Sequence, residues 1–142
     1  MIKLIALLKR KPEYTREEFA RRWLEDHIKL SARIPGVRGY RINIATPRQP
    51  EGTGEEPIYD GTAEMWWDSI DDMEAAFASD IGKAAGEDAD QFAAVRIHVY
   101  TEEHDIVPGP GKPAARKRAA AKRRPAKKTA RRGTKKSTRR AR

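Results

Sequence analysis

The first part of the chain changes its hydrophobic period twice. Residues 2–9 form a short apolar run of β-prone side chains, which predicts a strand. From Thr15 onward the apolar positions recur at helical spacing, and Thr15 with Glu18 can form a capping box at the start of a helix. We expect this helix to continue to about Arg33, before a Pro-Gly pair. Residues 37–45 then alternate between apolar and polar, which predicts a second strand.

A similar pattern follows, with longer connections. Residues 46–57 contain three prolines and two glycines, which indicates an irregular loop. Alternation over residues 59–67 predicts a third strand, and Ser69 is suited to cap a short helix after it. We interpret residues 79–91, which contain two glycines, as a broken connection with at most one helical turn. Residues 92–101 alternate again and predict a fourth strand.

The predicted order is β-α-β-β-α-β, which is the ferredoxin-like arrangement of the α+β class. Such a domain has an antiparallel sheet that is covered on one face by two helices. The other face would expose apolar side chains, and a second copy of the chain is the simplest cover for it. The pattern therefore predicts a homodimer.

Charge divides the chain into two parts. Residues 1–107 contain 14 Lys+Arg and 21 Asp+Glu, which gives a net charge of −7. Residues 108–142 contain 16 Lys+Arg and no acidic residue, which gives +16. We therefore expect a folded domain over 1–107 and a disordered tail rich in Lys, Arg, Ala and Pro over 108–142.

The tail repeats a basic doublet every four residues from position 123. These doublets are Arg123, Arg124, Lys127, Lys128, Arg131, Arg132, Lys135, Lys136, Arg139 and Arg140. Such a polycation, which resembles the tails of linker histones, binds phosphate by charge. Because the tail has no aromatic residue, we predict binding to DNA or RNA without sequence preference. A solubilising spacer and a segment that docks on an acidic protein are the alternatives.

Several kinds of chemistry are not expected. The chain has no cysteine, which excludes disulfides, thiolate metal sites and a Cys nucleophile. We find no phosphate-binding glycine loop, dinucleotide fingerprint or metal-ligand spacing, so neither a cofactor nor a metal is expected. The N-terminal apolar run of five residues is too short for a signal peptide or a membrane span. We expect a cytoplasmic protein without membrane contact, and the tail suggests association with the nucleoid.

The first predicted helix carries an imidazole in its apolar stripe. On a helical projection that starts from Phe19, His27 falls near the middle of the apolar face, close to Trp23. A buried imidazole needs a partner for each ring nitrogen, and its charge changes easily near neutral pH. His27 is therefore either a satisfied core residue or the polar group of a cavity between helix and sheet.

Other candidate side chains also have two interpretations. Trp66 and Trp67 are consecutive on a strand, so they face opposite sides and either pack in the core or stack on a flat ligand. Asp60 precedes Gly61 and is either a turn acceptor or a general base. His98, on the fourth strand, faces either the cavity or the solvent.

Two segments resemble those of EthD-domain proteins. The stretch "EEFARRWLEDH" matches the family's F-x3-W-x3-H signature, and "YDGTAEMWWDSIDDMEAAFAS" is similar to its second block. The resemblance covers about residues 1–106 and implies a dimeric α+β barrel with a ligand pocket inside each subunit. It makes His27 a candidate catalytic residue and Asp60 a weaker one. The candidate ligand-binding residues are Phe19, Trp23, Tyr40, Trp66, Trp67 and His98.

The resemblance implies a class of function without fixing the reaction. The domain would be a small-molecule-binding protein or a cofactor-independent enzyme that acts on an apolar or aromatic compound. The reaction would be of the oxidative degradation, isomerase or cyclase type. The alternative is a non-enzymatic nucleoid-associated protein in which the barrel serves only for dimerisation.

Overall fold

The computed structural model describes residues 1–52, 54 and 56–110. The ten basic-doublet residues of the predicted tail lie outside the described residues. Residues Met1–Asp105 form one compact unit.

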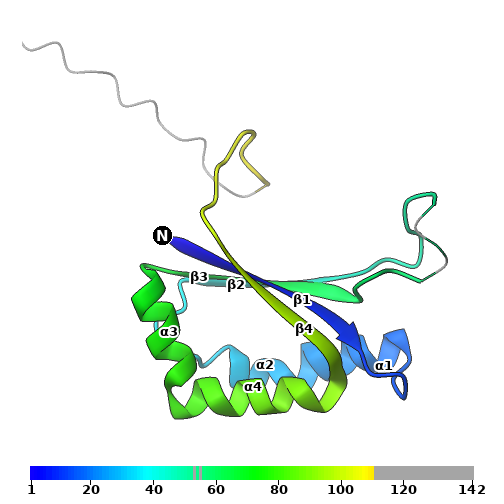
Figure 1. Cartoon of the computed structure of the whole chain (residues 1–142), viewed down its shortest axis with the longest axis horizontal. Coiled ribbons are helices and arrows are strands. Elements are labelled where there is room, and N and C mark those ends of the chain that lie inside the picture. The colour runs from blue at the N-terminus through cyan, green and yellow to red at the C-terminus, as the bar shows by residue number, and fades with distance from the viewer. Residues whose placement is uncertain (53, 55, 111–142) are drawn as a thin grey trace, which may run out of the picture. The chain divides into compact units, whose positions relative to one another are not determined.

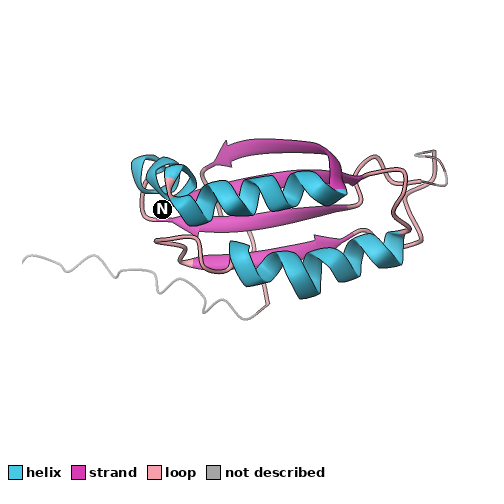
Figure 2. Ribbon diagram, turned by 90° about the horizontal axis from the view of Figure 1, so that it is seen from below, coloured by secondary structure: helices cyan, strands magenta, loops and turns pink. Residues whose placement is uncertain are grey.

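The compact unit is built on a four-stranded antiparallel sheet. Its strands are β1 (Ile2–Arg10), β2 (Gly39–Ile44), β3 (Gly61–Trp67) and β4 (Ala93–Thr101). Their order in the sheet is β2-β3-β1-β4, and each neighbouring pair is antiparallel. The helices all lie on one face of this sheet, as Figure 1 and Figure 2 show. The predicted α+β ferredoxin-like fold is confirmed, as are the four strands.

The first helical segment contains a wide turn that the sequence did not reveal. It runs through α1 (Arg16–Arg21), the π-helical η1 (Arg22–His27) and α2 (Ile28–Ser31), two residues short of the predicted end. The predicted capping box starts it. The Thr15 hydroxyl accepts from the Glu18 amide at 3.1 Å, and the Glu18 carboxylate accepts from the Thr15 amide at 2.9 Å. Trp23 and His27 both belong to the π-helical turn, a feature that often marks a functional site.

The segment that we predicted to be a broken connection is a helix, so the prediction for residues 79–91 is wrong. After α3 (Ile70–Ala78), which Ser69 caps as predicted, α4 spans Asp80–Phe92. The Ser79 hydroxyl caps α4 by accepting from the Gly82 amide at 3.1 Å. The buried residues of α4 recur at helical spacing and are Gly82, Ala85, Ala89 and Phe92.

A close helix crossing explains the glycine that misled the prediction. A Cβ atom at Gly82 would lie 2.3 Å from the carbonyl oxygen of Ala76 and 2.6 Å from Cα of Phe77. Gly82 therefore permits the end of α3 to contact the start of α4. Its role is in packing, and it does not interrupt α4.

The core lies between the sheet and the helices. The residues of β1 that face the helices are Ile2, Leu4, Ala6 and Leu8, and all are buried. On the neighbouring strand, a Cβ at Gly61 would lie 2.7 Å from Cζ3 of Trp23. The glycine of the Asp-Gly pair therefore allows the Trp23 ring to pack directly on the backbone of β3.

The opposite face of the sheet carries an apolar stripe that no helix covers in the compact unit. Val95, Ile97 and Val99 of β4 are 41–44% exposed. The register places Ile97 beside Leu7 and Val99 beside Ile5. We call these five residues the open face.

Candidate functional site

A small cavity lies between the sheet and the helices. Its volume is about 50 Å³. The polar side chains that line it are His27 from η1, Tyr40 from β2, and Arg96 and His98 from β4. Trp23 and a set of aliphatic core residues supply much of the remaining wall. Four of the predicted site residues, Trp23, His27, Tyr40 and His98, are thus brought together around one cavity.

His27 is held in a defined orientation at the cavity wall. The residue is 7% exposed, and its ring contacts the ring of Phe92 edge-on, with 5.4 Å between the centroids. Its Nδ1 lies 2.8 Å from Oδ2 of Asp88, a residue of α4. The π-helical turn therefore presents the imidazole to the cavity while α4 fixes one of the two ring nitrogens.

Arg22 completes a cluster with this pair. Its guanidinium donates to both carboxylate oxygens of Asp88, at 3.2 Å and 2.5 Å. Burial raises the pKa of Asp88, but the hydrogen bonds from Arg22 and His27 outweigh it, so the pKa lies below its ordinary value. Asp88 is therefore an ionised carboxylate at neutral pH and acts as an acceptor from both neighbours.

The environment keeps His27 neutral. Burial lowers its pKa, and the positive charges of Arg22 and Arg96 lower it further, although Asp88 opposes them. Because ionised Asp88 can only accept, the proton of the neutral ring lies on Nδ1. The second ring nitrogen, Nε2, then carries a lone pair and can accept a proton from a molecule in the cavity.

A second set of hydrogen bonds lies around Tyr40, which also lines the cavity. The Ser31 hydroxyl donates to the carbonyl oxygen of His27 at 3.1 Å and lies 3.1 Å from the Tyr40 hydroxyl. Burial raises the pKa of Tyr40, although hydrogen bonds with Ser31 and Trp23 oppose that effect. Tyr40 therefore remains a neutral phenol that can donate or accept within the cavity wall.

The other predicted ligand-binding side chains lie away from the cavity. Phe19 is buried behind Trp23, with 5.4 Å between the ring centroids. Trp67 is fully buried, and its Nε1 donates to the carbonyl oxygen of Pro35 at 3.0 Å. Trp66 lies on the side of the sheet opposite the helices, where the Lys3 ammonium sits 4.9 Å from the ring. None of the three residues lines the cavity, and their contacts are with other residues of the domain.

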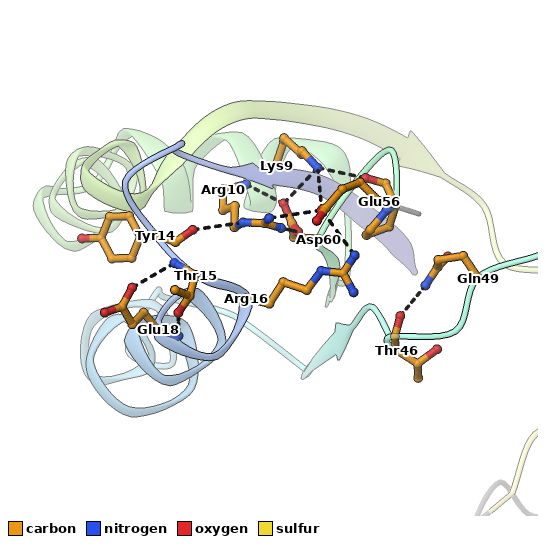
Figure 3. Close-up of polar contacts among 11 residues, drawn as sticks. Lys9, Arg10, Tyr14, Thr15, Arg16, Glu18, Thr46, Gln49, Glu56 and Asp60 are labelled. Atoms are coloured by element: carbon orange, nitrogen blue, oxygen red, sulfur yellow. Dashed lines mark hydrogen bonds and ion pairs between the residues drawn. The ribbon is translucent and has the colours of Figure 1, made fainter. Parts of the chain in front are cut away.

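Asp60, the weaker catalytic candidate, belongs to an ion-pair cluster at the start of β3. Its carboxylate accepts from the Arg10 amide at 2.8 Å and pairs with the Arg10 guanidinium, while the Lys9 ammonium lies at 3.5 Å (Figure 3). Glu56 joins the cluster through Arg10 and Arg16. Asp60 does not line the cavity, and its bonds tie the loop before β3 to the end of β1.

Reasoning from sequence missed Asp88, Arg22 and Arg96. Asp88 was one of several acids in a segment interpreted as a loop, so nothing singled it out. Had Ala85, Ala89 and Phe92 been recognised as a helical stripe, Asp88 would have fallen at its edge. Arg96 did carry a signal, because strand alternation placed it on the same face as His98.

The described residues give no indication of a metal centre or a membrane span. Among residues 1–52, 54 and 56–110, no three His, Asp or Glu side chains gather as a metal-binding group. Within the same ranges, every helix is too short or too polar to cross a membrane.

The fold and the cavity define the class of protein: a ferredoxin-like α+β domain with a few polar side chains in the wall of a largely apolar cavity. The EthD domain matches residues 11–96. An ethyl tert-butyl ether D (EthD) family protein from Bacillus halodurans C-125 is 31% identical, with a TM-score of 0.62, over 73% of this chain and 99% of that protein. The chain therefore belongs to the EthD family.

Two more distant structures share the fold. One is a dimeric ferredoxin-like protein of unknown function from Thermobifida fusca YX, at 21% identity and a TM-score of 0.55, over 70% of this chain and 88% of that one. The other is SnoaB, a cofactor-independent oxygenase from Streptomyces nogalater, at 13% identity and a TM-score of 0.52. That match covers 76% of this chain and 97% of SnoaB. A search of curated proteins found no match.

Proposed function

We propose that the domain binds a small apolar or aromatic compound in this cavity and transfers a proton from it to His27, without a cofactor. The observation that carries the proposal is the 2.8 Å contact of His27 Nδ1 with Asp88, on a ring that lines the cavity. This contact leaves Nε2 as the base. Asp88 orients the ring and stabilises the imidazolium that forms, and Arg22 holds Asp88 in place.

Proton abstraction from an acidic carbon or hydroxyl is a common first step of the reactions considered above. In an isomerase, the protonated His27 returns the proton to a different carbon of the delocalised anion. In a cyclase, the anion attacks an internal carbonyl, and the carbonyl oxygen takes the proton back from His27 as the C=O π bond breaks. In a cofactor-independent oxygenase, the substrate anion passes electrons to dioxygen. SnoaB is described as such an oxygenase. The two histidines and Tyr40 are the groups in this cavity that can accept or donate the proton.

Native mass spectrometry of the purified chain tests the proposal. We expect the wild type to retain a small molecule, or to bind added benzoate or benzamide, and His27→Gln to weaken this by about tenfold. His27→Phe is the second variant, because it keeps the packing against Phe92. If His27→Phe raises thermal stability and leaves binding unchanged, His27 is a core residue and the proposal fails.

The open face supports a second part of the proposal, a homodimer that forms an α+β barrel. Three exposed β-branched side chains in a row on an edge strand are costly in water, and a second copy would bury them. The Thermobifida fusca structure, which is described as dimeric, has the same fold.

The basic tail supports a third part of the proposal. Residues 108–142 carry 16 Lys+Arg and no acid, so we propose that they bind DNA or RNA without sequence preference and hold the domain close to nucleic acid. Association with the nucleoid would follow from this binding.

A non-enzymatic nucleoid-associated protein is the competing function, in which the barrel serves only for dimerisation. The observation that favours it is the cavity volume of about 50 Å³, since a cavity that holds benzene measures about 150 Å³. The two functions predict opposite results in the mass spectra. The first requires bound small molecule, and the second requires none even at high ligand concentration.

A further inference from the structure

The cavity has a volume of about 50 Å³, whereas a cavity that holds benzene measures about 150 Å³, so an aromatic ligand fits fully only if part of the wall moves. Most of the wall is buried core: Leu4, Leu8 and Trp23 are each at most 3% exposed. Arg96 differs from these residues because its side chain is long and 26% exposed. Among the described residues that line the cavity, it is also the one with a permanent charge.

Arg96 is held at the rim by a weak contact. Its Nη2 donates to Oδ1 of Asp90 at 2.9 Å, and the Asp90 side chain is 63% exposed. An ion pair this exposed contributes little stability and breaks easily. Because Gly86 has no side chain, α4 leaves space beside the guanidinium, and a Cβ there would lie 3.7 Å from Nη1.

The charges around the cavity favour an anion. His27 is neutral, and the carboxylate of Asp88 is already paired with Arg22. Among the described residues that line the cavity there is no Asp or Glu, so Arg96 has no carboxylate partner in the wall, and it pairs instead with the exposed Asp90. A ligand carboxylate would gain a desolvated, charge-assisted bond in exchange for a solvated one.

We propose that Arg96 is the anion-binding residue of this site and that its pair with Asp90 is a latch. The ligand class is an apolar or aromatic compound with one acidic oxygen group, such as a carboxylate or phenolate. Arg96 leaves Asp90 to bind that group, and its movement opens the rim. His27 then faces the apolar part of the ligand. This inference rests on the proposed function, because it assigns the ligand class of the same cavity.

Benzoate and benzamide, which have the same shape but differ in charge, are the probes. Their dissociation constants are measured on the full chain by NMR titration, following the Trp23 indole and the His27 ring. We expect the wild type to bind benzoate at least about tenfold more tightly than benzamide. Arg96→Met should abolish this preference and Arg96→Lys should restore part of it. Asp90→Asn should tighten benzoate binding by up to about fivefold, because the latch is lost.

Arg38→Met is the matched control, since Arg38 forms an exposed pair with Asp68 away from the cavity. It should bind both probes as the wild type does. If benzoate and benzamide bind equally, or Arg96→Met keeps the preference, the role of Arg96 is refuted while the cavity remains a binding site. If neither probe shifts the Trp23 or His27 signals at millimolar concentration, the proposed function fails and the inference fails with it.

Discussion

At the scale of the residue, two effects set the protonation state of His27: burial and the contact with Asp88. Burial favours the neutral ring, and Asp88 determines which nitrogen carries the proton. A phenylalanine at this position would satisfy the packing against Phe92 without either effect. A buried imidazole therefore costs stability that packing alone does not require, and this cost favours a chemical role for His27.

This cost should appear in the pH dependence of stability. The folded-state pKa of His27 lies below its ordinary value of 6.5, so the unfolded chain binds the proton more readily. Its contribution to stability is complete above pH 6.5 and is lost as the pH falls below that value toward the folded-state pKa. We expect the free energy of unfolding, measured by urea denaturation at pH 8 and pH 5.5, to fall less in His27→Phe than in the wild type.

Other charged and titratable groups also face His27, and this experiment needs controls for them. Despite burial, the hydrogen bonds between Asp88 and Arg22 lower the pKa of Asp88 and raise that of Arg22, so this pair stays charged between pH 5.5 and 8, and the guanidinium of Arg96 also acts on the ring. Burial lowers the pKa of His98 as well. His98→Phe is therefore measured in parallel, and the exposed His104→Ala is the control. An unchanged pH slope in His27→Phe would show that the ring is not held neutral by the fold.

At the scale of the element, α4 places two glycines in different surroundings. Gly82 lies against the backbone of α3, and a Cβ would overlap the carbonyl oxygen of Ala76. Gly86 lies in the same helix, but a Cβ there meets only the tip of Arg96 at ordinary contact distance. Local sequence does not distinguish them.

Alanine substitutions should separate these two positions. Gly86→Ala should raise the free energy of unfolding by up to about 1 kcal/mol, because alanine favours the helical backbone. Gly82→Ala should lower it by about 1–3 kcal/mol, because α3 must shift to admit the methyl group. Thermal and urea unfolding of both variants provide the measurement. Destabilisation of equal size in both would mean that helix packing does not govern Gly82.

At the scale of the whole molecule, the open face should control the oligomeric state. We expect the wild type to be a dimer by sedimentation at micromolar concentration, and Ile97→Asp to be a folded monomer, because a charge in an apolar interface is strongly unfavourable. Leu24→Asp is the matched control: Leu24 is 43% exposed, similar to Ile97, but lies in η1 on the helical side. A wild-type monomer, or a dimer of Ile97→Asp, would refute the barrel.

The basic tail, residues 108–142, should control nucleic-acid binding. If about half of its 16 positive charges contact phosphates, log K should fall against log[salt] with a slope of about −7 per tail. Filter binding at several salt concentrations compares the full chain with one that ends at Val107. We expect the shorter chain, at −7 net charge, to bind weakly or not at all. Equal binding by both chains would place the site on the folded domain.

The sequence by itself determined the four strands, the order of the elements along the chain and the first helix with its cap. These features depend on local periodicity and on short-range hydrogen bonds, such as the one between Thr15 and Glu18. Residues that are close in the sequence determine both. Local pattern also placed Trp23 and His27 on the buried face of the helix. It failed for α4, because three of the four buried residues of its stripe are glycine or alanine and the glycines resemble helix breakers.

Only the tertiary structure decided which side chains form the site. Asp88 is 61 residues from His27 along the chain and reaches it because α4 packs beside η1. Arg96 reaches the same cavity from a strand at the other end of the sheet order from Tyr40. A hydrogen bond between distant segments depends on the packing of whole elements. The sequence therefore indicated that His27 needed a partner, and the fold determined that Asp88 is the partner.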